Sequence, residues 1–223
     1  MRRALILGAS LLGCIIGQSA SGDVLNVAAD GYVQYEISGN KYTVVDYYWV
    51  VLLNNNIYGE NRGIMEFDIS GVPDVLQSAT LSLWKYNRTP DFGGAISLLW
   101  YEGNGQVTVG DFSATATALT NLNFSPGRTE AGQQIDVDVL SPLQHAVASN
   151  WSHLGFRVRT TSSSGDVSYG AVGTSDWPGG SEKAPILTYE VPEPATLALL
   201  AIGGVALVRR RHHLPLAATD IAD

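Results

Sequence analysis

Apolar and polar residues alternate one by one through much of the middle of this chain, and this constrains its fold more than any other feature. The run Met65–Ile69 reads MEFDI, with every second residue apolar. Successive side chains of a β-strand point to opposite faces, so the run predicts a strand with one buried and one wet face. The same alternation recurs at residues 79–84, 135–139 and 156–159.

Turn-forming residues separate the predicted strands, as in Gly71-Val72-Pro73 and Gly103-Asn104-Gly105. One short helix interrupts the series: we expect Ser141 to cap it and Pro142 to occupy its first position. Many short strands with one short helix predict an all-β fold, an antiparallel jelly-roll-like β-sandwich.

The first 22 residues have the composition of a signal peptide. Arg2 and Arg3 precede an apolar stretch over residues 4–16, and small polar residues follow. We expect cleavage near residue 22. The only cysteine of the chain, Cys14, lies in this segment, and Leu11–Cys14 faintly resembles a lipoprotein box. Without lipid attachment there, the mature domain has no thiol chemistry.

The other end of the chain has three parts in a fixed order. Pro192-Glu193-Pro194 would end any preceding strand, because proline cannot donate to a ladder. A 14-residue apolar run over 195–208 follows, shorter than the roughly 20 residues of a comfortable membrane helix. The cluster Arg209-Arg210-Arg211 would hold that helix on the cytoplasmic side.

This order resembles the PEP-CTERM sorting signal of Gram-negative bacteria, over residues 192–213. The resemblance implies recognition by an exosortase, transient anchoring in the inner membrane, and delivery to the cell surface or extracellular matrix. It also implies a link to exopolysaccharide and biofilm. Residues 214–223 form a short tail beyond the arginines, where members of the family usually stop.

Between these ends, residues 23–191 form one acidic domain. The stretch holds 8 Lys+Arg and 18 Asp+Glu, for a formal charge of −10. DNA and RNA are recognised by basic faces, so a nucleic-acid partner is not expected. All five Trp of the chain fall in this stretch, enough aromatic surface for a solid core.

The order of the predicted strands carries a second resemblance. It runs through Arg62–Pro73, Ser78–Leu83, Ile135–Val139, Leu154–Arg159 and Pro185–Tyr189. This profile is similar to the DNRLRE-type domain, related to family 96 of carbohydrate-binding modules. The family implies a jelly roll attached to polysaccharide-acting enzymes and cell-wall proteins, with some members similar to alginate binders.

Aromatic residues are the first candidates for a binding site. Trp84 and Tyr86 lie two apart on one strand face and could stack on two sugar rings, unless a loop or the second layer covers that face. The run Tyr47-Tyr48-Trp49 places rings on both faces of its strand. Trp177 lies in a loop rich in proline and glycine, where it either binds or packs on the core.

Charged residues are the second candidates. Arg157 and Arg159 share a strand face, where they either hold an acidic sugar or, as we favour, pair with acids across the sheet. Asp30 precedes a turn glycine and is a candidate ligand for a structural calcium, the one cofactor considered.

The acidic pairs could serve catalysis. Glu66 with Asp68, and Asp136 with Asp138, could act in a glycosidase or bind calcium, but we expect solvated strand faces. His145 and His153 are isolated and are expected to be structural, and no nucleophile elbow is present. No catalytic residue is therefore predicted.

Three functions remain open. The first is a non-enzymatic exported surface or matrix protein that contacts extracellular polysaccharide, including uronate-rich polymers. The second is a hydrolase or lyase acting on matrix polysaccharide. The third is a structural matrix subunit that associates through its sheet edges.

Overall fold

The computed structural model describes residues 22–46, 49–52, 54–55, 59–87, 94–124, 129–160, 170–173 and 183–192. The chain divides into two units, residues 21–191 and the two ends together. The expected signal peptide and the apolar run at 195–208 lie outside the described residues. No helix within the described part is long and apolar enough to cross a membrane.

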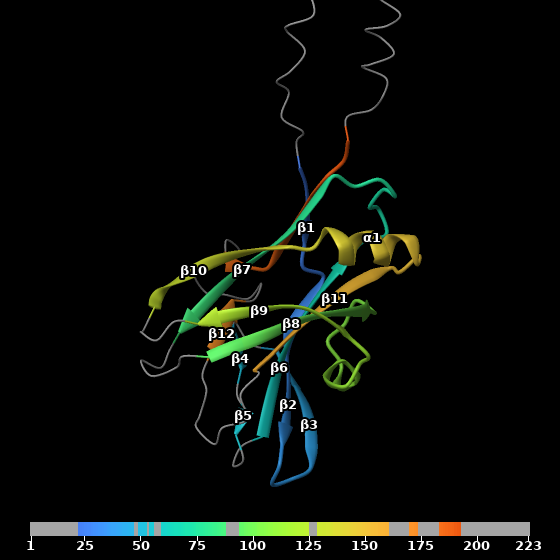
Figure 1. The fold of residues 1–223 in the computed structure, drawn as a ribbon. Coiled ribbons are helices and arrows are strands. Elements are labelled where there is room, and N and C mark those ends of the chain that lie inside the picture. Colours follow the sequence, from blue (N-terminus) through green and yellow to red (C-terminus); the bar gives the residue numbers. More distant parts are fainter. Residues whose placement is uncertain are drawn as a thin grey trace, which may run out of the picture. The chain divides into compact units, whose positions relative to one another are not determined.

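The domain consists of two antiparallel sheets, as predicted (Figure 1). Sheet A has β7 at its centre, because β10 pairs along one edge of β7 while β13 and β12 share the other. Its order is β1 (Asp23–Asn26), β13 (Ile186–Glu190), β7 (Ser78–Asn87), β12 (Gly170–Gly173) and β4 (Trp49–Leu52), with β10 (Thr129–Asp138) beside β7.

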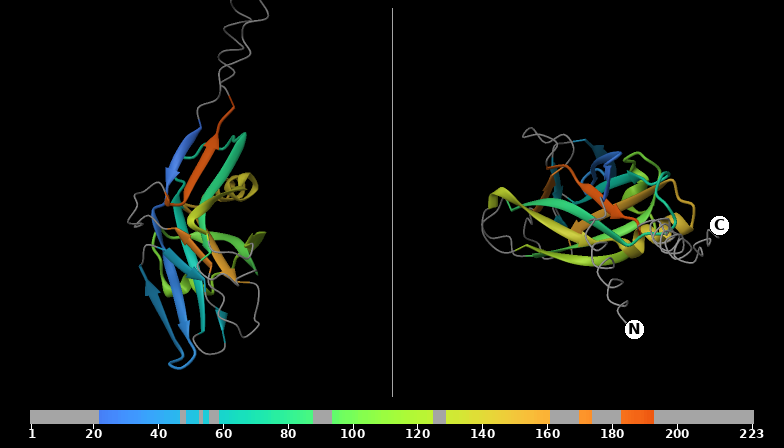
Figure 2. Two further views of the ribbon diagram at one scale, coloured as in Figure 1. Left: turned by 90° about the vertical axis from the view of Figure 1, so that its left-hand side faces the viewer. Right: turned by 90° about the horizontal axis from the view of Figure 1, so that it is seen from above.

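Sheet B is built from a continuous series of antiparallel neighbours. Its order is β3 (Lys41–Val45), β2 (Ala29–Glu36), β6 (Gly59–Asp68), β11 (His153–Thr160), β8 (Gly94–Gly103) and β9 (Thr117–Phe124), with β5 (Asn54–Asn55) beside β6. Figure 2 shows the two layers from the side and from above. The predicted all-β sandwich is confirmed.

The core lies between the sheets and consists of the apolar residues of the alternating runs. Met65 and Phe67 of β6, Leu81 and Leu83 of β7 and Phe156 of β11 are fully buried. The rings of Phe67 and Phe156 meet edge to face at 6.1 Å between centroids, a favoured aromatic geometry. The period-two pattern therefore identified the inner faces of these strands correctly.

Helix α1 (Leu140–Ala148) follows β10 directly and begins earlier than the sequence predicted. Its N-cap is Val139, and the first helical N–H, of Leu140, donates to the Asp138 carboxylate at 2.9 Å. Ser141 lies inside the first turn and is not the cap. The first N–H groups of a helix have no carbonyl partner within the helix, and the Asp138 side chain accepts one of them here.

The outer face of sheet B carries a second, smaller apolar cluster. The segment after β8 folds back across this face and includes the short helix η1 (Val109–Phe112). Phe112 of η1 packs there with Val33, Ile64 and Tyr101. Strand β9 begins only after this segment, at Thr117. The central strands of sheet B are covered on both faces.

Candidate functional site

Three aromatic rings meet at the α1 end of the sandwich, and we call them the aromatic trio: Trp100, His145 and Trp151. The Trp100 and His145 rings lie 5.1 Å apart, Trp100 and Trp151 5.8 Å, and His145 and Trp151 5.5 Å. His145 is exposed, and the two indoles are half-buried against the core. The trio is thus a fixed aromatic surface that solvent reaches.

The local chain path explains how the trio forms. Trp100 lies near the end of β8, opposite Thr117 at the start of β9. His145 occupies α1, and Asn150 adopts a left-handed conformation with φ of 56° that reverses the chain. The Trp151 N–H then donates to the Ala146 carbonyl at 3.0 Å, which returns the indole to the helix.

A groove lies along one side of the sandwich, where edge strands of the two sheets face each other. It lies between β9 at the edge of sheet B and β10 at the edge of sheet A, with a volume of about 320 Å³. Its lining is Leu119, Thr120, Leu122, Ile135, Asp136, Val137 and Asp138. Its last lining residue, Asp138, precedes the start of α1 by two residues.

Rings of this kind suit the apolar faces of sugars. An indole offers a wide flat surface and one N–H donor, and imidazole adds a second polar edge. Binding sites for small organic groups typically combine such apolar surfaces with a few polar atoms. Asp136 and Asp138 are exposed at the groove, and no basic side chain lines it among the described residues.

The aromatic residues predicted from the sequence lie elsewhere. Trp84 is half-buried on β7, and the Lys183 ammonium lies over its ring at 3.1 Å from the centroid. That ring face is occupied by a cation–π contact. Tyr86 and Trp49 belong to β7 and β4, but their side chains are not among those described. Tyr48 and Trp177 lie outside the described residues.

Arg157 proves to be a structural residue, which corrects both readings of it. Its Nη1 donates to the carbonyls of Asp111, Phe112 and Ala114 at 2.7, 3.0 and 3.0 Å, and only 5% of the residue is exposed. It neither faces an acid across the sheet nor is open to an acidic sugar. Burial lowers its pKa, and the nearby Arg62 adds to this.

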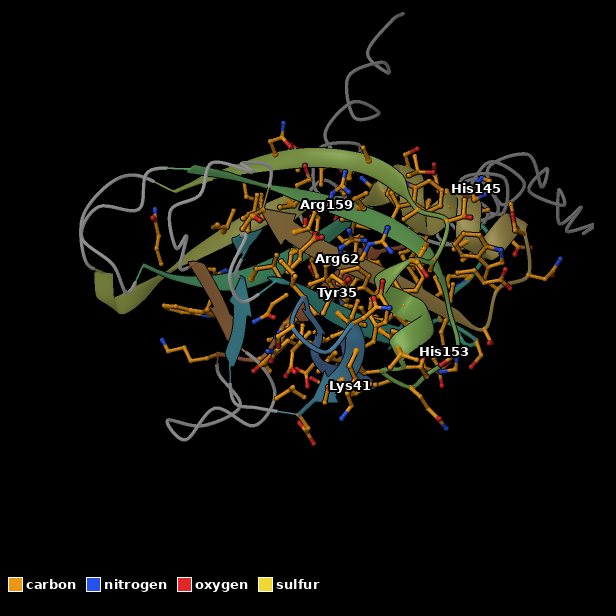
Figure 3. The ribbon with its side chains drawn as sticks, turned by 90° about the horizontal axis from the view of Figure 1, so that it is seen from below. Tyr35, Lys41, Arg62, His145, His153 and Arg159 are labelled. Atoms are coloured by element: carbon orange, nitrogen blue, oxygen red, sulfur yellow. The ribbon has the colours of Figure 1, made fainter. Side chains whose placement is uncertain are left out.

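Arg159, two residues further along β11, is half-buried. Figure 3 shows Arg159 and Arg62 near the middle of the view and His145 well apart from them on α1. The two arginines predicted as a pair thus differ in exposure. Neither lies in the aromatic trio.

Glu66 is also buried, contrary to the expected solvated face. Its carboxylate accepts the Tyr101 hydroxyl at 2.8 Å and the backbone N–H groups of Asn104 and Gly105 at 2.8 and 2.5 Å. Burial and the nearby Glu66 charge raise the pKa of Tyr101 far above its ordinary value. We call residues 104–116, between β8 and β9, the covering segment. Glu66 therefore holds the start of the covering segment onto β6.

Asp68, Asp136 and Asp138 are exposed, as expected for wet strand faces. Asp30 lies half-buried in β2. In the described part of the chain, no three His, Cys, Asp or Glu side chains gather as a metal site would require. The structural calcium considered at Asp30 stays a prediction.

The sequence analysis missed the aromatic trio. His145 was read as isolated, and neither Trp100 nor Trp151 was among the candidate binding residues. The available signal was local: a histidine in a helix that ends three residues before a tryptophan. Its relation to Trp100 depends on which sheet edge α1 reaches, and one sequence does not determine that.

Comparisons with known proteins concern mainly the end of the chain. The PEP-CTERM protein-sorting motif matches residues 190–211, beginning at the last residue of β13. No family match supports the resemblance to DNRLRE-type domains. No curated protein matches the chain in sequence.

Two solved structures are distantly similar. The K1 cleaved adhesin domain of Lys-gingipain from Porphyromonas gingivalis W83 shares 11% identity at a TM-score of 0.36, over 79% of this chain and 94% of that domain. The VP2 subviral particle of infectious bursal disease virus shares 13% at 0.24, over 85% and 42%. The specific finding is the tail: this chain carries a PEP-CTERM sorting motif, the exosortase signal of exported proteins in Gram-negative bacteria.

Proposed function

We propose that this chain is a non-enzymatic surface or matrix protein that contacts extracellular polysaccharide through the aromatic trio. The observation that carries the proposal is the meeting of Trp100, His145 and Trp151 within 6 Å of one another at a surface that solvent reaches. The sorting motif supports the location, since it brings the domain to where such polymers lie.

The charge of the site favours a neutral polymer over a uronate-rich one. Arg157, the residue that would have held an acidic sugar, is committed to three backbone carbonyls. Asp136 and Asp138 line the neighbouring groove and would repel uronates. Stacking on uncharged sugar faces needs no basic partner.

Binding of the full-length chain to a neutral β-glucan and to alginate, measured by affinity electrophoresis, tests the proposal. We expect retardation by the glucan, with Trp100→Ala and Trp151→Ala each weakening affinity about tenfold, a loss of about 1.4 kcal/mol. Trp100→Tyr should retain most of the affinity. Trp84→Ala is the matched control, because that ring is engaged by Lys183.

The outcomes separate the proposals. If neither polymer binds, or if Trp84→Ala weakens binding as much as Trp100→Ala, the trio is not the site. The hydrolase or lyase alternative would show itself by new reducing or unsaturated ends, lost on Asp136→Ala. The hydrogen bonds that Asp136 and Asp138 accept from neighbouring groups argue for structural roles instead.

A further inference from the structure

Strand β3 forms the outer edge of sheet B. Its one partner among the described strands is β2, and the hairpin they form extends beyond the neighbouring strands (Figure 2, left). Edge strands present a row of backbone N–H and C=O groups that can pair with another strand. Proteins that avoid such pairing place charges or prolines along the edge, whereas β3 carries one charge, at Lys41.

Apolar side chains lie on this edge. Tyr42 is 44% exposed and Val44 is 39% exposed, both on the same face of β3. The Tyr42 ring rests against Tyr35 and Phe112, each at 4.9 Å between centroids, and Val109 of η1 is also exposed. We call this surface the hairpin patch. Clustered exposed apolar groups of this kind mark interaction sites.

We propose that the hairpin patch is a self-association surface, at which β3 pairs antiparallel with β3 of a second copy of this chain. A two-fold axis through Thr43 relates the two strands. The pairing joins the two copies of sheet B into one continuous sheet. It satisfies the open backbone edge and covers Tyr42 and Val44.

The pleat fixes the register of this pair. Tyr42 and Val44 project from one face of β3 and Thr43 from the other, and residues directly opposite in an antiparallel pair project to the same face. The register centred on Thr43 pairs all five residues of β3. It places Tyr42 opposite Val44 of the second copy on both sides of the axis, and such aromatic–β-branched pairs stabilise sheets.

The charges at the two ends of β3 are complementary in this register. Lys41 begins the strand and Asp46 follows its last residue. Antiparallel pairing brings Lys41 of each copy beside the end that leads to Asp46 of the other, and it keeps the two lysines at opposite ends. This local attraction opposes the general repulsion between two acidic domains.

Pairing would give the protein two aromatic trios, one per copy. Such a dimer could hold two segments of polysaccharide and gain avidity for a polymer matrix. This consequence rests on the proposed function. The association itself does not, and it is tested without any glycan, so the two proposals can fail separately.

Site-directed cross-linking of the full-length chain tests the register. In a Cys14→Ser background the chain has no other thiol. Thr43→Cys then places two cysteines opposite each other at about 5 Å between Cα atoms, within disulfide reach. Lys41→Cys is the matched control on the same strand, because its two copies would lie about 13 Å apart, four residues along the strand.

We expect mild oxidation to convert Thr43→Cys largely to a covalent dimer on a non-reducing gel. Lys41→Cys and the exposed Val75→Cys should stay monomeric. Equal cross-linking at all three positions, or none at Thr43, would overturn the proposal.

A second experiment removes the association. Val44→Lys puts a charge opposite Tyr42 of the second copy, and it should raise the dimer dissociation constant at least tenfold in sedimentation equilibrium. Val75→Lys makes the same change at an exposed valine away from the patch and should leave the constant unchanged. If Val44→Lys behaves like Val75→Lys, β3 is not the interface.

Discussion

Tyr101 of β8 donates its hydroxyl to the Glu66 carboxylate of β6 at 2.8 Å, across the intervening strand β11. Both residues are almost fully buried, and no arginine or lysine is bonded to the carboxylate in the described part of the chain. Three neutral donors satisfy it instead, two of them backbone N–H groups of the covering segment. The pair thus ties a segment far along the chain to the centre of sheet B.

Glu66→Gln should lower the free energy of unfolding by about 2 kcal/mol. The amide keeps one acceptor oxygen but turns its NH₂ group toward donors, and hydrogen bonds to a charged group are worth about 1.5–3 kcal/mol. Urea denaturation followed by tryptophan fluorescence measures the change. Asp68→Asn, two residues along the same strand and exposed, should change stability by less than about 0.5 kcal/mol.

Gly155→Ala should be similarly costly, for a steric reason. A Cβ at this position would lie 2.5 Å from the Tyr101 ring, closer than such contacts occur. Overpacking of this kind costs about 1–3 kcal/mol. Gly71→Ala is the control, since a Cβ there meets nothing within 4 Å, and equal unfolding midpoints for the two variants would contradict the packing described around Tyr101.

The sequence predicted the inner faces of the strands because burial there follows a local rule. Met65, Phe67 and Phe156 are buried where alternation placed them. Glu66 failed the same rule, because β6 is covered on both faces. The covering segment comes from residues beyond β8. The residues around Glu66 therefore contain no pattern that predicts its burial.

The binding residues were harder to predict for a related reason. Arg157 and Arg159 are the same residue type on the same face of one strand. Only Arg157, however, donates hydrogen bonds to the carbonyls of η1 and of the residues just after it. The aromatic trio joins a strand, a helix and a turn that are separated by up to 51 residues. Composition indicated that aromatic rings were available, but the fold decides which of them meet.

Arg157→Lys should loosen the covering segment without unfolding the sandwich. All three bonds come from the buried Nη1, and a lysine ammonium ends one bond short of that position along the side chain, so it cannot reach the three carbonyls together. We expect amide hydrogen exchange at residues 109–114 to speed up at least tenfold, while β7 and β13 exchange as before. Arg159→Lys should leave both regions unchanged. Uniform acceleration across the domain would mean that Arg157 supports the whole fold instead.

Asp136 provides a pH-dependent test at the groove. The Gln134 amide at 2.9 Å and the Ser82 hydroxyl at 2.7 Å both donate to its carboxylate, and these bonds hold its pKa below the ordinary 3.8. A carboxyl whose pKa is lower in the folded state stabilises the fold above the unfolded value. That stabilisation is lost as the pH falls through the folded value.

Gln134→Ala should therefore raise the pKa of Asp136 toward 3.8, measured by NMR titration of its carboxyl carbon. The variant should be less stable than the parent at pH 6, and the difference should shrink as the pH falls below 3.8 toward 2 and Asp136 becomes protonated. Gln133→Ala, the adjacent residue, should alter neither quantity. A stability difference that persists unchanged at pH 2 would show that Gln134 acts through packing and not through the carboxylate, because protonation removes only the charge-dependent part of its contribution.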